Sequence, residues 1–372
     1  MTAKTPEIIC TIKQYRRRKG LSQTELADKV GVRRQAIYDM ESGRYLPNTL
    51  VALKIANILG CTVEMLFIPQ AAQVTSNLAF LDASPSTPSR LAVAQVRDKL
   101  IGIPLHTTPT RPFSLQAADG IFHANESFEC FLNSQQLAHT LLMLGCDPAL
   151  SVLQDIVTRN APLLRTHNVF ASSQKALMTL NEGKAHIAGT HYQNETGNAN
   201  VEAAQSLAAK TNPLIIALGI QEEGLMVASG NPLGIVGVES LVNPHVRFVN
   251  REEGAALRKL LISQLQKKGI PPTAVPTFDE LVFSHSEGAL RITSNLADAA
   301  LGPRVVAQSF GLDFVPLSAT RSDLVIPADL QDEQSVAILL NILQSKELQQ
   351  ALSALPGYDA SLTGTIILKQ NP

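Results

Sequence analysis

The chain of 372 residues lacks a long apolar segment, since no run approaches the ~18 residues that a membrane-spanning helix needs. No signal peptide precedes the first predicted helix, so we expect a cytoplasmic protein with no membrane partner. The four cysteines are scattered and form no CxxC pair, which excludes a zinc knuckle and a disulfide framework. Internal repeats and low-complexity tracts are also missing.

Sequence patterns typical of enzymes are missing as well. No nucleophile–base pair and no paired carboxylates at catalytic spacing emerge, and the glycines of "SGNPLGIVG" (229–237) lack the strand–turn–helix context of a dinucleotide-binding loop. His186 and His191 flank a predicted strand end, but no nearby Asp, Glu or Cys completes a metal site, so we interpret them as core or cleft lining. The sequence therefore predicts a protein that is not an enzyme and holds no metal.

Charge divides the chain into a basic first segment and an acidic remainder. Residues 1–68 hold 11 of the 31 Lys and Arg residues and 6 of the 32 Asp and Glu residues, so their net charge is +5 and that of residues 69–372 is −6. A basic segment exchanges counterions with DNA, whereas an acidic one is repelled by it. The length suggests two or three domains, of which we expect only the first to bind nucleic acid.

Residues 7–67 carry the most specific pattern, which predicts five short helices around a helix-turn-helix. Ser22, followed by Glu25, forms a capping box at the start of one helix. Gly31 follows that helix and tolerates the left-handed turn to the next one, expected over residues 33–41. The outer side of this second helix carries Arg and Gln, whose side chains present bidentate donors to base edges in the major groove.

Residues 22–43 read "SQTELADKVGVRRQAIYDMESG", which resembles the lambda-repressor-like (XRE-type) DNA-binding domains. The resemblance continues into "YRRRKG" before this stretch and "LKIANILGCTVEMLF" after it. It implies double-stranded operator DNA as a partner, with seven contact residues: Arg34, Gln35 and Asp39 on base edges, Arg33 on bases or backbone, and Gln23, Ser42 and Arg44 on phosphates.

The same resemblance implies a buried ion pair between Arg16 and Glu41, which we assign to structure. Two positions depart from the family pattern. Met40 stands where an aromatic residue is common, and Asp39 is unusual on a DNA-facing surface. The alternative for this segment is a helical bundle that makes only protein contacts.

We expect four consecutive regions: a helix-turn-helix domain in 1–69, a linker in 70–90, a β-rich connector in 91–136 and a ligand-binding domain in 137–372. The linker is rich in Ala, Ser, Thr and Pro, and short β-like runs follow it. From residue 137 strands alternate with helices, which indicates a parallel-sheet α/β fold. The predicted fold class is multidomain, with an all-α head and an α/β body.

The stretches "LLMLGCDPALSVL", "ASSQKALMTLNEGKAHIAGTHY" and "RFVNREEGAALRKLL" resemble the bilobed, type II periplasmic-binding-protein-like domains that are fused to DNA-binding heads in bacterial regulators. The resemblance implies one lobe from 137–215 and 318–372 and a second from 224–312. The chain would cross between the lobes near 217–224 and 314–317. A ligand would bind in the cleft, and closure of the lobes would be the signal.

Loops that follow parallel strands gather at one edge of the sheet, where helix N-termini present unpaired N–H groups. Family members that bind molybdate or tungstate use hydroxyls and amides there, so the resemblance points to a small oxyanion or to an anionic metabolite such as a molybdenum-cofactor species. The predicted ligand-binding residues are Cys146, Asp147, Ser172, Ser173, Arg251, Glu252, Glu253, Arg258, Ser284 and His285.

Three acidic residues near the predicted ligand site disfavour an anionic ligand. Glu252 and Glu253, expected in the first turn of a helix, and Asp147 in the other lobe would repel an anion, so an amine-bearing or neutral ligand stays open. The glutamates can equally point into solvent. Cys146, just before a helix N-terminus, allows either a redox- or electrophile-sensing thiol or a small residue that fills a tight loop.

We predict a one-component transcriptional regulator that binds an operator as a homodimer or higher even oligomer and senses a small-molecule effector in its cleft. Two alternatives stay open. One is a cofactor-handling enzyme or ligand carrier with an autoregulatory DNA-binding head. The other is an antitoxin-like or phage-type repressor whose body only assembles oligomers. The regulator requires ligand binding without turnover, the enzyme requires turnover, and the repressor requires neither.

Overall fold

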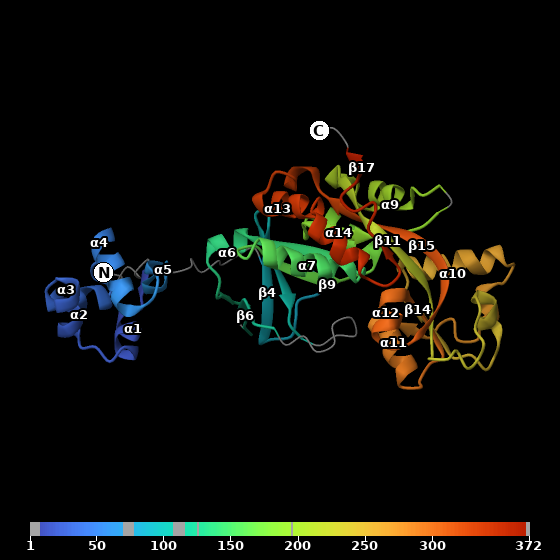
Figure 1. Ribbon diagram of the computed structural model, residues 1–372, viewed down its shortest axis with the longest axis horizontal. Coiled ribbons are helices and arrows are strands. Elements are labelled where there is room, and N and C mark those ends of the chain that lie inside the picture. The colour runs from blue at the N-terminus through green and yellow to red at the C-terminus, as the bar shows by residue number, and fades with distance from the viewer. Residues whose placement is uncertain (1–7, 70–77, 107–115, 125, 195, 370–372) are drawn as a thin grey trace. The chain divides into compact units, whose positions relative to one another are not determined.

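The computed structural model describes residues 8–69, 78–106, 116–124, 126–194 and 196–369 (Figure 1). The chain forms two compact units, which we call the head and the body. The head comprises residues 1–74 with 130–133, and the body comprises residues 75–129 with 134–372. Every helix within the described ranges is too short or too polar to cross a lipid bilayer.

The described residues of the head form five helices, as the sequence predicts. They are α1 (Ile12–Arg18), α2 (Gln23–Val30), α3 (Arg34–Glu41), α4 (Thr49–Leu59) and α5 (Val63–Leu66). Strand β1 (Ile8–Cys10) pairs antiparallel with β2 (Phe67–Pro69). Each helix contributes buried side chains to one apolar core, which includes Ile12, Leu26, Ile37, Ile55 and Leu66.

Local features of the helix-turn-helix confirm the sequence prediction. The Ser22 hydroxyl accepts a hydrogen bond from the Glu25 N–H at 3.1 Å, and the Glu25 carboxylate accepts one from the Ser22 N–H at 2.7 Å. Such a cap contributes about 1 kcal/mol to helix stability. Gly31 adopts φ 81°, in the left-handed region. Arg16 and Glu41 form the expected ion pair at 2.6 Å.

Strands β3 to β7 form a five-stranded sheet in the order β3-β5-β4-β6-β7, which we call the connector. They are β3 (Leu78–Phe80), β4 (Ser89–Val96), β5 (Lys99–Pro104), β6 (Gly120–Phe122) and β7 (Phe128–Cys130). Ala94, Ile101 and Ile103 share an apolar core with Leu142 and Val169 of the α/β fold. The connector is therefore a packed layer of the body, which the sequence did not reveal.

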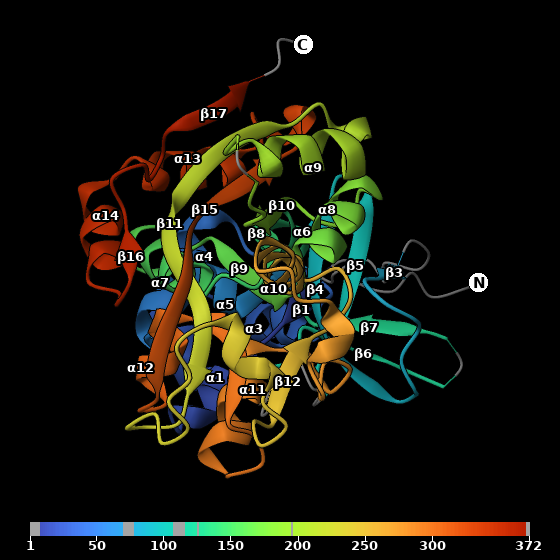
Figure 2. The ribbon, with the colours of Figure 1, turned by 90° about the vertical axis from the view of Figure 1, so that its right-hand side faces the viewer.

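The main sheet of the body carries two lobes. Lobe one holds the parallel strands β8 (Thr140–Gly145), β9 (Arg165–Phe170) and β10 (Ile187–Thr190), and lobe two holds β12 (Phe248–Arg251), β13 (Leu281–Val282) and β14 (Ala299–Pro303). Two antiparallel strands, β11 (Leu214–Val227) and β15 (Asp313–Ile326), run side by side through both lobes (Figure 2). We call them the hinge strands, because each predicted crossing lies inside one of them.

Helices of the body cover the two lobes. Lobe one carries α6 (Ser134–Ala138), α7 (Ala149–Asn160), α8 (Ser173–Asn181), α9 (Ala199–Leu207), α13 (Gln334–Leu343) and α14 (Lys346–Ser353). Lobe two carries α10 (Ala256–Lys267), α11 (His285–Thr293) and α12 (Arg304–Ser309). Strands β16 (Tyr358–Asp359) and β17 (Ile366–Lys369) pair with β11.

One predicted helix boundary is wrong. Glu252 and Glu253 precede α10 instead of lying in its first turn, because the chain turns at Gly254, whose φ is 85°. The two carboxylates therefore do not stabilise that helix as residues of its first turn.

Candidate DNA-binding surface and ligand cleft

The surface of α3 carries the residues expected to contact base edges. Arg33, at the N-cap position, and Arg34 and Gln35, in the first turn, are exposed. Asp39 lies one turn further on and accepts a hydrogen bond from Gln35 Nε2 at 3.1 Å. This pairing along the helix gives a physical reason for a carboxylate on a surface that is otherwise basic.

The residues expected on phosphates flank α3. Ser42 and Arg44 are exposed after its last turn, and the Arg44 guanidinium lies 5.7 Å from the centre of the Tyr38 ring. Gln23 is half-buried and donates through Nε2 to Glu41 at 2.8 Å, which ties it to the buried ion pair of the core. The contacts of these residues with DNA stay predictions.

Buried polar side chains from both lobes meet in what we call the cleft floor. Cys146 and Asp147 follow β8, His191 follows β10, Arg251 ends β12 and His285 begins α11. None of these five residues is more than 6% exposed. The sequence placed four of them in the ligand site and interpreted His191 as lining.

Cys146, His191 and Glu223 form a hydrogen-bonded chain in the cleft floor. The Cys146 Sγ lies 2.9 Å from His191 Nε2, and His191 Nδ1 lies 2.5 Å from Glu223 Oε1 on β11. Burial by itself lowers the pKa of His191, but the charges of Cys146 and Glu223 and their hydrogen bonds outweigh it and raise that pKa well above 6.5. The sequence showed no nucleophile–base pair, and the structure brings a thiol and an imidazole that are remote in sequence to hydrogen-bond distance.

Arg251 joins the two lobes. Its Nε and Nη2 donate to Glu252 at 2.8 and 2.9 Å, and its guanidinium lies 5.5 Å from the centre of the Phe170 ring in lobe one. Its Nη1 lies 2.9 Å from Nδ1 of His285. Burial first, and then the Arg251 charge, lowers the pKa of His285 well below its usual value. Glu252 balances the Arg251 charge in this arrangement.

Asp147 follows Cys146 in the chain, and both oxygens of its carboxyl group accept hydrogen bonds. Its Oδ1 accepts from the Ala149 N–H at 2.8 Å, and its Oδ2 accepts from the Tyr358 hydroxyl at 3.3 Å. Burial raises the pKa of Asp147, which opposes its negative charge.

The remaining predicted ligand residues occupy three kinds of position. The hydroxyls of Ser172 and Ser284 cap α8 and α11, and Ser173 is buried in the first turn of α8. Glu253 is exposed. Arg258 is half-buried, and its Nη1 donates to the backbone carbonyl of Arg251, a residue of the cleft floor, at 3.0 Å. Of these residues, Glu253 is therefore the one that the structure leaves exposed to solvent.

Sequence reasoning missed the polar face of the hinge strands. Gln221 and Glu223 on β11 and Asp323 on β15 are at most 3% exposed. The Gln221 Nε2 donates to Glu223 at 3.3 Å, whereas its Oε1 has no hydrogen-bond partner among the described residues. The signal was the polar run "QEE" inside an otherwise apolar strand. Within the same described ranges, no three His, Cys, Asp or Glu side chains are grouped to hold a metal ion.

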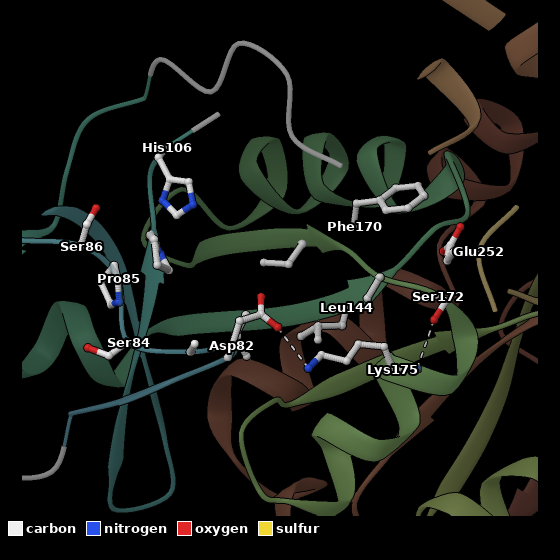
Figure 3. Close-up of a pocket in the computed structure, with 15 residues that line it drawn as sticks. Asp82, Ser84, Pro85, Ser86, His106, Leu144, Phe170, Ser172, Lys175 and Glu252 are labelled. Carbon is white, nitrogen blue, oxygen red and sulfur yellow. Dashed lines mark hydrogen bonds and ion pairs between the residues drawn. The ribbon is translucent and has the colours of Figure 1, made fainter. Parts of the chain in front are cut away.

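A cavity of about 800 Å³ opens beside the cleft floor (Figure 3). Its walls come from the connector and both lobes: Leu81, Asp82, Ala83, Ser84, Pro85, Ser86, Pro104, His106, Leu144, Val169, Phe170, Ala171, Ser172, Lys175 and Glu252. Phe170 and Glu252 also contact Arg251, so the cavity and the floor share residues. A salt bridge of 3.1 Å between Lys175 and Asp82 links lobe one to the connector across this wall.

Comparison with known families agrees with this architecture, a helix-turn-helix unit joined to a two-lobed binding fold. The helix-turn-helix family profile matches residues 12–66, and the profile of the PBP superfamily domain matches residues 155–344. Because the second match covers more than half of the 372 residues, the chain belongs to the PBP superfamily.

Individual relatives match one part of the chain or the other. The uncharacterized protein YvgK of Bacillus subtilis is 32% identical over 201 residues, which are 54% of this chain and 65% of that protein, so less than two thirds of its length is spanned. An uncharacterized HTH-type transcriptional regulator of Archaeoglobus fulgidus is 46% identical over 57 residues, 15% of this chain and 81% of that protein.

Similar solved structures include two transport proteins. One is a putative phosphate ABC transporter substrate-binding protein with bound phosphate from Clostridium perfringens, with 9% identity and a TM-score of 0.45, covering 57% of this chain and 96% of that one. The other is a tungstate ABC transporter from Geobacter sulfurreducens, with 12% identity and a TM-score of 0.44, covering 57% and 97%.

Proposed function

We propose that the protein is a one-component transcription regulator whose head binds operator DNA and whose body binds a small-molecule effector. The helix-turn-helix match and the exposed basic start of α3 support the first part. Membership of the PBP superfamily and the buried polar floor between the lobes support the second. We also propose an even oligomer, because two heads on half-sites about one helical turn apart multiply the modest specificity of one head.

The cavity beside the cleft floor carries the proposal about the effector. Its volume of about 800 Å³ lies within the ~300–1,000 Å³ typical of pockets that enclose organic ligands, and it is much larger than a tetrahedral oxyanion needs. The balanced charge of Arg251 also leaves little attraction for a bare anion at the floor. We therefore propose an organic metabolite with an apolar part against Phe170 and polar groups near Lys175. A molybdenum-cofactor species belongs to this class, whereas molybdate or tungstate alone does not.

Lobe closure is the proposed signal. A ligand shifts an equilibrium between open and closed lobes only if it binds the two states with different affinity. Arg251 in lobe two contacts Phe170 in lobe one, and the cavity borders Phe170 and Glu252, the ion-pair partner of Arg251. The cavity wall at residues 81–86 belongs to the connector, which follows the head in sequence.

Titration calorimetry on the full chain tests this proposal. Pterin derivatives and nucleotides are titrated beside sodium molybdate and sodium tungstate, and operator fragments selected from genomic DNA are then bound with and without each compound. We expect at least one organic compound to bind without being converted and to change operator affinity. Ser86→Trp, which fills the cavity, should abolish that binding, and Ser151→Trp on the exposed face of α7 should not.

Three results would count against the proposal. Binding of molybdate or tungstate alone, with an unchanged affinity in Ser86→Trp, would replace the organic effector with an oxyanion. Chemical conversion of the bound compound would favour a cofactor-handling enzyme. If the full chain showed no selective DNA binding, the proposal that it is a transcription regulator would be wrong.

A further inference from the structure

We propose that Cys146 is a reactive thiol that hydroperoxides oxidise to a sulfenic acid, with His191 and Glu223 as positioning residues. The inference rests on the proposed function for its setting, because it gives the effector cleft a second, oxidative input. Three observations carry it: the linear arrangement of thiol, imidazole and carboxylate, their burial in the cleft, and an unsatisfied acceptor beside them.

The geometry favours a thiolate. His191 lies between the Cys146 sulfur, at 2.9 Å, and a Glu223 oxygen, at 2.5 Å, so both ring nitrogens are engaged. An imidazolium donates through both nitrogens, which suits a thiolate on one side and a carboxylate on the other. All three residues are at least 94% buried, and low polarity strengthens such an ion pair. A thiolate is the form of cysteine that reacts as a nucleophile.

A second feature of the same place is a hydrogen-bond acceptor that has no partner among the described residues. Gln221 is 3% exposed, and its Nε2 donates to the same Glu223 oxygen that His191 contacts. Its Oε1 has no partner among the described residues, and a buried unpaired acceptor is costly. A hydroperoxide carries an O–H donor that such an acceptor can bind.

The reaction balances without another reactant. The Cys146 thiolate attacks one oxygen of the hydroperoxide, an S–O bond forms and the O–O bond breaks. Sulfur loses two electrons and becomes a sulfenic acid, and the peroxide is reduced. The departing oxygen takes the proton of the His191 imidazolium and leaves as water or an alcohol. The added oxygen lies on a sulfur that is 2.9 Å from His191 Nε2, so oxidation alters the contact between these two residues.

The reduced full chain is treated with hydrogen peroxide in the presence of dimedone, and peptide mass spectrometry gives a separate rate for each cysteine. We expect Cys146 to react at least 10-fold faster than half-buried Cys61, whose pKa burial raises. Between pH 7.5 and pH 6 the rate at an ordinary thiol of pKa about 8.5 falls roughly 30-fold. The rate at Cys146 should fall less than 3-fold. His191→Gln should slow Cys146 at least 10-fold and restore the ordinary pH dependence.

The outcomes separate chemistry from burial. Unfolding in urea should slow Cys146, because it removes His191. A faster reaction in urea, or a wild-type rate at Cys146 that follows pH as Cys61 does, overturns the proposal even if His191→Gln fails to fold. The rate of thiol oxidation is measured without DNA, so the two proposals fail independently. An unreactive Cys146 would not contradict the proposed regulator, and a lack of operator binding would not contradict the proposed thiol chemistry.

Discussion

Asp119→Asn tests how firmly the connector is held against lobe one, and therefore how rigid one wall of the effector cavity is. Asp119 is 5% exposed and its Oδ2 accepts from the Val93 N–H of β4 at 2.8 Å. The same carboxylate pairs with Arg165 and, at 3.2 Å, with His167, both on β9 of lobe one. It thus fastens the connector sheet to the main sheet.

The size of the effect follows from the pKa of Asp119. Burial by itself raises this pKa, but hydrogen bonds from His167, Arg165 and the Val93 N–H outweigh it and lower the pKa from 3.8 to about 2. A shift of nearly two units corresponds to about 2 kcal/mol of stability. Losing one partner of a buried ion pair costs roughly 3–5 kcal/mol, which sets the upper limit for the variant.

The pH dependence has a definite sign. Because the pKa of Asp119 is lower in the folded state, the stabilisation is complete above pH ~4 and disappears as the pH falls through about 2. The difference in the free energy of unfolding between wild type and Asp119→Asn should therefore be about 2 kcal/mol or more at pH 7. About half of the linkage contribution of about 2 kcal/mol should be gone at pH 3.

Urea unfolding followed by far-ultraviolet circular dichroism, with hydrogen exchange at the β4 amides to locate the change, measures this difference. Asp82→Asn is the matched control, because its pair with Lys175 is exposed and should contribute less than about 1 kcal/mol. A stability of Asp119→Asn equal to that of the control at pH 7, or a difference that stays constant down to pH 3, would refute the reasoning.

Three further predictions concern DNA, the lobes and pH. In anisotropy titrations, the double variant Arg34→Ala, Gln35→Ala should lose affinity for the operator far more than for non-specific DNA, whereas Arg44→Ala should weaken binding to both alike. If the double variant kept its operator affinity, the start of α3 would not be the recognition surface. Arg251→Met should weaken effector binding at least 10-fold by calorimetry, since it removes the contact between the lobes, and should leave DNA binding by the effector-free protein intact. Burial, and then the Arg97 charge, lowers the pKa of His186 to about 4. Between pH 6.5 and about 4 only the unfolded state binds the proton, so the free energy of unfolding of the wild type should fall by about 3 kcal/mol over this range. His186→Gln should lack this slope in urea unfolding, and an equal slope in both proteins would contradict a neutral buried imidazole.

Short-range signals made the head predictable from sequence. The capping box of Ser22 and Glu25 and the left-handed Gly31 lie within a few residues of the helices they bound, so local backbone preferences determine them. The pairing of Arg16 with Glu41 came from the family resemblance, and the structure confirms it. Apolar runs predicted strands in the connector, whereas the two-lobed fold was predicted from the family resemblance.

The cleft chemistry depended on tertiary structure. Cys146 and His191 are 45 positions apart and His191 and Glu223 are 32 apart, and no periodicity in sequence relates the ends of β8 and β10 to a residue inside β11. The sequence also does not predict that the connector packs on lobe one. The apolar faces of β4 and β5 indicate that these strands are buried, but not which surface covers them. Sequence alone therefore determined which elements form, because helix and strand patterns are local. The fold decided which polar side chains meet, because strand register and sheet order set distances between residues that are remote along the chain.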